Sequence, residues 1–306
     1  MLAPATQAAG LYGKIPAQGD FVRANLVDPA ALEFTRWLES AQEALYRTNA
    51  VLPDVPVCFL FTAPGARNAV VGALLPSRDL VGRVFPLAVF LPVDAAALSR
   101  RFAHVPLAFV GFLGEVVRLL RDAPSLSTAE LASRLRELPV PGPQQWELAE
   151  GIAQTLLDGP VGGLLASVSD GGSAAYGFRT FLAACATDRA EPPARTRVVL
   201  ECPLAGEGPA PWLDLACRAL AWRQQPPAFL WTEAVPQRLL LSLGAPPPAL
   251  LSHLARADSQ LSVVWPLRTS QRAAQEAAEQ ALAPTQREAL SSPDWSIAHV
   301  FAALTT

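Results

Sequence analysis

Charged side chains that could do chemistry gather in two short segments of the chain. The first segment, Gly13 to Phe21, contains Lys14, the only lysine among the 24 Lys and Arg residues. The second segment runs from Pro76 to Pro86. If the segments meet in space, their cations and carboxylates could form a pocket for an acidic ligand or partner residue, or a structural ion-pair network. The side chains of this candidate cluster are Lys14, Asp20, Ser77, Arg78, Asp79 and Arg83.

The same segments are rich in residues that shape the backbone. Glycine adopts backbone angles that other residues resist, and proline fixes one of these angles. We expect the backbone of the cluster to be held by Gly13, Pro16, Gly19, Phe21, Gly82 and Pro86. A carboxylate pair for acid–base catalysis would require Asp20 and Asp79 to lie close to each other and to a cleft.

Known catalytic patterns do not match the chain. A Walker loop requires a glycine five positions before the Gly-Lys pair and Ser or Thr after it, but these positions hold Ala8 and Ile15. Neither a dinucleotide fingerprint at a strand-to-helix junction nor a G-x-S-x-G elbow is present. His104, His253 and His299 belong to no nucleophile or metal-ligand pattern. We therefore expect a protein that is not an enzyme, with no catalytic, cofactor-binding or metal-binding residues.

Composition narrows the class of protein. Hydrophobic residues make up 51% of the chain and charged residues 17%, which favours a globular fold with a large core. A net charge of −3 offers no basic surface for nucleic acid. Residues 1–9 lack the features of a signal peptide, and the apolar run 105–117 is too short to span a membrane. Four cysteines without a CxxC pair are typical of a reducing compartment, so we expect a cytoplasmic protein: Cys58, Cys185, Cys202 and Cys217.

Hydrophobic periodicity predicts hairpin-like strands and clustered helices. The expected strands are 55–61, 68–75, 83–91, 198–202, 228–232 and 238–243, and the second segment joins two of them. The expected helices are 29–46, 107–121, 128–138, 144–158, 211–223, 248–257, 271–283 and 296–304, with Asp28 and Ser127 as N-caps. This pattern indicates an α+β (mixed α/β) fold, in which helices cover an antiparallel-rich sheet and the C-terminal half contains helices and β-hairpins.

Prolines at positions 139, 141 and 143 form the best internal boundary of the chain. We therefore expect an N-terminal domain over residues 1–140 that carries both charged segments. A C-terminal α/β half over residues 141–267 would pack on it, and residues 268–306 would form a helical extension.

The two segments together resemble the signatures of a known family. Residues Gly13 to Phe21 (GKIPAQGDF) resemble the GKLPxxGDF signature of the TagF/ImpM family of type VI secretion-associated proteins. Residues Pro76 to Leu87 (PSRDLVGRVFPL) resemble its PSxDxVGRxFPL element, with Trp37 in the helix between. The segment FLWTE at 229–233 resembles the family's Trp-rich strand, although Leu230 replaces the first Trp of a common Trp-Trp pair. The resemblance is closest over residues 10–120, and it includes the conservative replacement of Leu by Ile15.

This resemblance implies a cytoplasmic accessory protein that restrains assembly or firing of the type VI secretion apparatus after translation. Some family members act through a forkhead-associated scaffold protein, alongside a threonine kinase and phosphatase pathway. The resemblance implies no catalytic residues. We expect a non-enzymatic regulator whose partners are regulatory or structural proteins of the apparatus, without nucleic-acid binding or membrane insertion.

Three alternatives remain open at this stage. A ligand-binding or hydrolytic domain would use the charged cluster on a phosphorylated ligand, and it requires a solvent-accessible pocket where the side chains converge. A structural scaffold component of the secretion apparatus would need no such pocket. The cluster could also be purely architectural, in which case the partner surface lies elsewhere.

Overall fold

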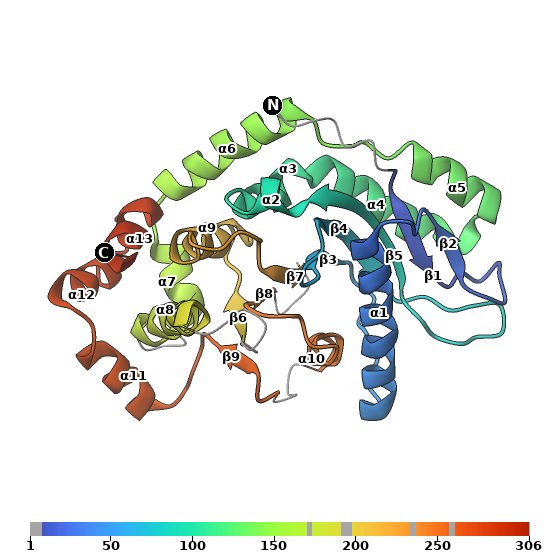
Figure 1. The fold of residues 1–306 in the computed structure, drawn as a ribbon. Coiled ribbons are helices and arrows are strands. Elements are labelled where there is room, and N and C mark those ends of the chain that lie inside the picture. Colours follow the sequence, from blue (N-terminus) through green and yellow to red (C-terminus); the bar gives the residue numbers. More distant parts are fainter. Residues whose placement is uncertain (1–7, 170–172, 191–197, 233–236, 257–260, 306) are drawn as a thin grey trace.

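A single open sheet joins the two halves of the chain (Figure 1). The computed structural model describes residues 8–169, 173–190, 198–232, 237–256 and 261–305. Within these residues the sheet has nine strands in the order β2-β1-β5-β4-β3-β7-β8-β6-β9. The strands are β1 (Gly10–Gly13), β2 (Val22–Ala24), β3 (Val57–Thr62), β4 (Asn68–Leu75), β5 (Leu87–Asp94), β6 (Val199–Pro203), β7 (Ala228–Thr232), β8 (Arg238–Ser242) and β9 (Val264–Pro266). Every pairing is antiparallel except that of β6 with β9. The expected mixed α/β fold with an antiparallel-rich sheet is confirmed.

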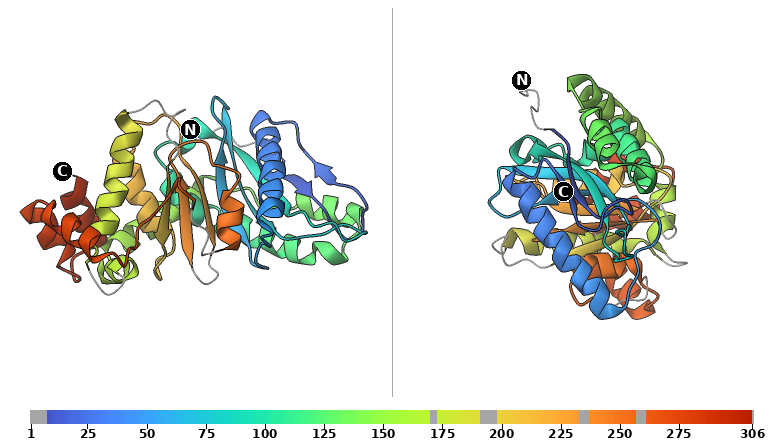
Figure 2. Two further views of the ribbon diagram at one scale, coloured as in Figure 1. Left: turned by 90° about the horizontal axis from the view of Figure 1, so that it is seen from below. Right: turned by 90° about the vertical axis from the view of Figure 1, so that its right-hand side faces the viewer.

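Helices cover both faces of this sheet (Figure 2). The helices are α1 (Pro29–Thr48), α2 (Ala95–Leu98), α3 (Val105–Ala108), α4 (Val110–Asp122), α5 (Thr128–Arg136), α6 (Pro143–Asp158), α7 (Gly162–Ser169), α8 (Ala175–Ala190), α9 (Ala210–Ala219), α10 (Leu250–Ala255), α11 (Arg272–Gln280), α12 (Pro284–Leu290) and α13 (Ile297–Thr305). Helices α1 and α10 pack on one face, while α4, α5, α6 and α9 pack on the other. Helices α11 to α13 lie at the end of the molecule farthest from α1 (Figure 1).

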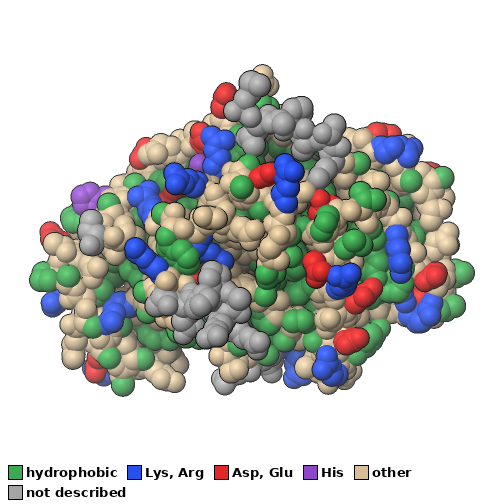
Figure 3. Space-filling model, viewed as in Figure 1, with side chains coloured by type: hydrophobic (Ala, Val, Ile, Leu, Met, Phe, Trp, Pro, Cys, Tyr) green, Lys and Arg blue, Asp and Glu red, His purple; other side chains and the backbone are tan. Residues whose placement is uncertain are grey.

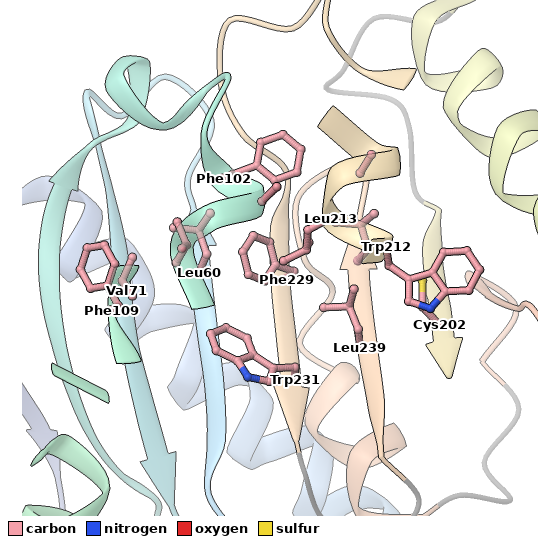
Figure 4. Close-up of a cluster of buried hydrophobic side chains, with 14 of the residues drawn as sticks. Leu60, Val71, Phe102, Phe109, Cys202, Trp212, Leu213, Phe229, Trp231 and Leu239 are labelled. Carbon is pink, nitrogen blue, oxygen red and sulfur yellow. The ribbon is translucent and has the colours of Figure 1, made fainter. Parts of the chain in front are cut away.

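Two hydrophobic cores follow from the alternation of side chains along the strands. Leu60 and Val71 point into the larger core, whereas their neighbours Phe59 and Val70 point into the core beneath α1. Because both faces are covered, the strands are apolar on both faces. The larger core crosses from β3 and β4 to β7 and β8, and Phe229 and Trp231 lie in it (Figure 4).

The pairing of β3 with β7 links the segments on either side of the expected domain boundary at residue 140. Cys58 lies opposite Trp231, and Leu60 lies opposite Phe229. The two expected halves therefore share one sheet and both hydrophobic cores. The division into residues 1–140, 141–267 and 268–306 stays a prediction, and residues 1–7 and 306 at its ends lie outside the described residues.

Several element boundaries differ from the sequence-based expectations. The expected strand 83–91 begins at Leu87, because the residues before it belong to a separate hairpin. The expected helix 107–121 is two helices that break at Phe109. The sequence analysis did not predict the segments β1, β2, α2, α7, α8, β9 and α12. The N-caps are confirmed: the Asp28 carboxylate accepts from the Ala30 N–H at 2.8 Å, and Ser127 forms a capping box with Glu130.

None of the helices within the described residues is by itself long and apolar enough to cross a membrane. The consecutive segments Phe102–Ala108 and Val110–Ser125 reach the required length and hydropathy only together, and they are bent by 60° relative to each other.

Candidate functional site

The second charged segment folds into a small hairpin between β4 and β5. The Asp79 N–H donates to the Arg83 carbonyl at 3.1 Å, and the Gly82 N–H donates to the Asp79 carbonyl at 3.0 Å. Three residues, Leu80 to Gly82, therefore form its tip. Gly82 has φ 88°, as a three-residue hairpin loop requires at this position. Arg78 lies opposite Val84, so we call residues 77–85 the signature hairpin.

The carboxylate of Asp79 closes this hairpin. Its Oδ1 accepts from the Val81 N–H at 3.1 Å and from the Arg83 N–H at 2.9 Å. Its Oδ2 accepts from Lys14 Nζ at 2.9 Å and from Arg83 Nε at 2.6 Å. An aspartate at the first position of a turn commonly binds backbone N–H groups in this way. Here the same side chain also holds two cations.

The first charged segment lies directly beside the hairpin. A turn begins at Ile15, with Pro16 at its second position, and is closed by the Gln18 N–H, which donates to the Ile15 carbonyl at 3.1 Å. The Gln18 carbonyl then accepts from the Leu80 N–H at 2.9 Å, and the Gly19 carbonyl accepts from the Arg83 guanidinium. The two segments are therefore joined by backbone hydrogen bonds as well as by charge.

Lys14 is enclosed between a carboxylate and an aromatic ring. Only 8% of its side chain is exposed, and its Nζ lies 5.1 Å from the centre of the Phe21 ring. Phe21 in turn contacts Tyr12 and Phe85, with ring centres 5.2 Å and 4.8 Å apart. A cation is stabilised by the face of an aromatic ring. The ammonium group is thus part of the packing between the two segments.

The electrostatics of the site favour ionised Asp79. Burial alone would raise the pKa of this carboxyl. The hydrogen bonds from Lys14 and from the backbone and side chain of Arg83 outweigh that effect and hold the pKa well below its usual value. Near neutral pH the Asp79 carboxyl is therefore ionised, and its Oδ2 lies 2.9 Å from Lys14 Nζ.

The structure does not bring every candidate residue into this network. The side chain of Asp20 is exposed and accepts from the neighbouring Phe21 N–H at 2.7 Å. Among the described residues, no hydrogen bond or ion pair joins Asp20, Arg78 or the Ser77 hydroxyl to Asp79. The hydroxyl of Ser77 plays no part in the hairpin, whereas its carbonyl accepts from the Phe85 N–H at 3.0 Å. Asp20 and Asp79 thus form no carboxylate pair.

The structure also gives the expected backbone role to only some of the residues predicted to shape the backbone. Gly13 and Gly82 have positive φ angles, and Pro16 lies at a turn corner. Gly19, by contrast, has no positive φ angle, and open space surrounds it. Its part in the site is its carbonyl group, which any residue could supply. The remaining two, Phe21 and Pro86, pack beside Lys14 and Gly13 respectively.

These segments lie within a recognised domain. The model of the TagF N-terminal domain, type VI secretion system-associated, matches residues 10–138. Residues 10–138 of the chain are thus a TagF N-terminal domain. Lys14 and the whole signature hairpin fall inside the matched region.

A solved structure shares the fold. The crystal structure of PA0076 from Pseudomonas aeruginosa PAO1 superposes with a TM-score of 0.50 at 19% sequence identity. The likeness covers 85% of this chain and 99% of PA0076, so it extends well beyond the TagF N-terminal domain. No curated protein matches the sequence.

The TagF domain presents apolar residues at the tip of the hairpin. Leu80 and Val81 are 69% and 70% exposed, and Val84 on the adjacent strand is also exposed. A groove of about 150 Å³ lies between Val84 and the C-terminal end of α1. The sequence analysis missed this groove, because its walls come from segments that meet only in the fold.

A second polar network, which the sequence analysis also missed, lies in the C-terminal half of the chain. Glu201 on β6 accepts from the Arg238 guanidinium at 2.8 Å and lies 3.1 Å from His253 Nε2. Burial alone would raise the pKa of Glu201, but these two partners lower it. Arg238 also donates to the carbonyls of His253 and Leu254, at 3.1 and 2.9 Å. The network attaches α10 to the sheet, so His253 is a paired core residue.

The described residues include four cysteines and three histidines, which are side chains suited to metal binding or catalysis. No set of three His, Cys, Asp or Glu side chains there has the arrangement of a metal site. Burial raises the pKa of the Cys185 and Cys217 thiols to about 12. Burial lowers the pKa of His104, and His299 is exposed against Trp295.

Proposed function

We propose that this protein is a non-enzymatic accessory protein that regulates type VI secretion after translation by contacting another protein. It would restrain assembly or firing of the secretion apparatus. The observation that supports the proposal is the signature hairpin, in which Asp79 binds Lys14 and Arg83 while the apolar tip faces solvent.

The hairpin is well suited to protein contact. Leu80 and Val81 are exposed, yet the backbone that carries them is fixed by Asp79, Gln18 and Gly19. Exposed apolar side chains on a rigid support are typical of binding surfaces, because little conformational entropy is lost when a partner docks. The network of Asp79 with Lys14 and Arg83 thus holds the apolar tip in an exposed position.

The contacts of Lys14 and Arg83 support the ligand-binding alternative less well than they support a role in protein contact. A phosphorylated ligand requires cations that converge on an accessible cleft. Lys14 is buried against Asp79, and Arg83 already binds both Asp79 and Gly19. A phosphate would have to displace the carboxylate that closes the hairpin. We therefore propose that the cluster positions the tip and does not act on a ligand.

The description of the TagF domain supports a partner within the type VI secretion apparatus or its regulatory proteins. A forkhead-associated scaffold protein in the cytoplasm is the partner that fits the proposed role, since some members of the family act through such a scaffold.

The test compares two exposed valines in the bacterium that encodes this chain. Val81→Asp places a charge at the tip, and Val110→Asp places one on α4 at a residue of similar exposure, 68%. Each variant replaces the native protein, and release of a secreted protein of the apparatus is measured by immunoblot, together with the level of the variant itself.

We expect increased release with Val81→Asp and native release with Val110→Asp, at equal protein levels. Reduced release with Val81→Asp would instead indicate a structural component of the apparatus. Unchanged release would exclude the tip as a regulatory contact.

A further inference from the structure

The groove beside the signature hairpin has the features of a binding site for one side chain. Its walls come from the C-terminal end of α1, the residues after it and the hairpin, and they include Gln42, Tyr46, Val51, Pro76, Val84 and Pro86. Its volume of about 150 Å³ is that of a cavity that holds a benzene ring. The Tyr46 hydroxyl donates to the Val84 carbonyl at 2.7 Å, so the two walls are already joined.

One polar side chain lies in the wall of this apolar groove. Gln42 is only 6% exposed, and within the described residues no hydrogen bond or ion pair engages its amide. Its amide atoms are not among the fully buried atoms that lack a partner, so they are accessible from the groove. A side-chain amide presents both a donor and an acceptor, which matches the two polar groups of a peptide bond. This unpaired amide is the feature of the groove that indicates a peptide as its occupant.

A cation lies at the edge of the same groove. Arg78 and Val84 are directly opposite each other in the antiparallel hairpin, and such residues project from the same face. Since Val84 lines the groove, the exposed side chain of Arg78 lies on the groove side. Among the described residues Arg78 takes part in no ion pair, unlike Arg83 on the opposite face of the hairpin. Its charge complements a carboxylate.

We propose that this groove binds an aromatic side chain of a partner protein, with a carboxylate next to that side chain pairing with Arg78. The peptide group of the bound residue hydrogen-bonds to the Gln42 amide. This inference rests on the proposed function in one respect, because it describes the chemistry of the partner that the hairpin contacts.

The test uses purified full-length protein and three small probes. N-acetylphenylalanine carries the ring, a peptide group and a carboxylate, N-acetylphenylalaninamide lacks the charge, and N-acetylalanine lacks the ring. Each probe is titrated into isotope-labelled protein at low salt, and backbone amide chemical shifts are followed by nuclear magnetic resonance.

We expect N-acetylphenylalanine to shift the resonances of residues 42–52 and 76–86. An exposed ion pair contributes about a two- to fivefold change in affinity, so the uncharged amide should bind weaker by that factor. Arg78→Gln should remove the difference between these two probes, whereas Arg100→Gln, at another exposed arginine, should preserve it. Gln42→Leu should weaken binding of both probes.

Equal binding of the charged and uncharged probes to native protein would overturn the proposal. Shifts outside the groove, or equal binding of N-acetylalanine, would overturn it as well. Because the titration needs no secretion apparatus, its outcome is separate from the secretion assay. Binding in the groove together with normal secretion by Val81→Asp would leave this inference standing and overturn the proposed function.

Discussion

Gly13 lies against the backbone of Pro86, with no room for a side chain between them. A Cβ atom on Gly13 would overlap the Pro86 carbonyl oxygen and would lie 2.7 Å from the Leu87 Cα. The φ angle of Gly13 is 147°, a value that other residues rarely adopt. This contact sets how closely the end of β1 approaches the start of β5, and therefore how close Lys14 is to Asp79.

Gly13→Ala should destabilise the fold by about 2–4 kcal/mol, because backbone strain and steric overlap act at the same residue. The free energy of unfolding in urea measures this effect. Gly19→Ala in the same signature is the matched control, and it should change stability by less than about 0.5 kcal/mol, since open space surrounds Gly19. Similar losses for the two variants would contradict the role assigned to Gly13.

Lys14→Met should lower the free energy of unfolding by roughly 1–3 kcal/mol, because a buried carboxylate loses one of its donors. Arg36→Met removes an arginine from an exposed pair with Glu33 and should have an effect below about 1 kcal/mol. The shift in urea midpoint at constant m-value distinguishes them. If the two variants were equally stable, the buried pair would make no net contribution.

Asp79 should make the protein sensitive to acid. The fold lowers the pKa of this carboxyl, so the unfolded chain takes up its proton more readily than the native protein does. The resulting stability is complete above the unfolded pKa of about 3.9 and is lost as the pH falls below that value. Urea midpoints measured between pH 7 and pH 2 should therefore decline less steeply for Asp79→Asn than for the native protein. A native slope for Asp79→Asn would refute the assignment.

Arg238 should control the local stability of α10. Arg238→Met removes the donors to the His253 and Leu254 carbonyls and leaves Glu201 with one partner fewer, a loss of about 3 kcal/mol. Hydrogen exchange should accelerate first at the amides of Leu250–Ala255. Arg218→Met breaks an exposed pair with Asp214 and serves as the control. Unchanged exchange in α10 would show that hydrophobic contacts alone hold this helix.

The sequence predicts those elements whose signals are local. Asp28 and Ser127 mark helix starts because capping involves only residues two or three positions away. The position of the second charged segment between two strands was also predictable, because that signal is local as well. By contrast, β1 and β2 are short, and they join the sheet only through the pairing of β1 with β5, so their own sequences carry little strand signal.

The site was predictable in outline but not in detail. Lys14 and Asp79 are far apart in sequence, and only the fold shows that they pair. The sequence alone does not distinguish Asp20 from Asp79. In the structure only Asp79 begins a hairpin whose N–H groups point at its carboxylate. The groove depends on the packing of α1 against the hairpin, which no local pattern encodes.

The pairing of β3 with β7 has a consequence for synthesis of the chain on the ribosome. Until residues 228–232 have emerged, β3 is an edge strand, and its row of backbone N–H and carbonyl groups is unpaired on one side. Exposed edges of this kind recruit strands from other molecules. A nascent chain that stops after the TagF domain would thus expose the unpaired apolar edge of β3. Premature termination or proteolysis before residue 228 should therefore yield aggregates.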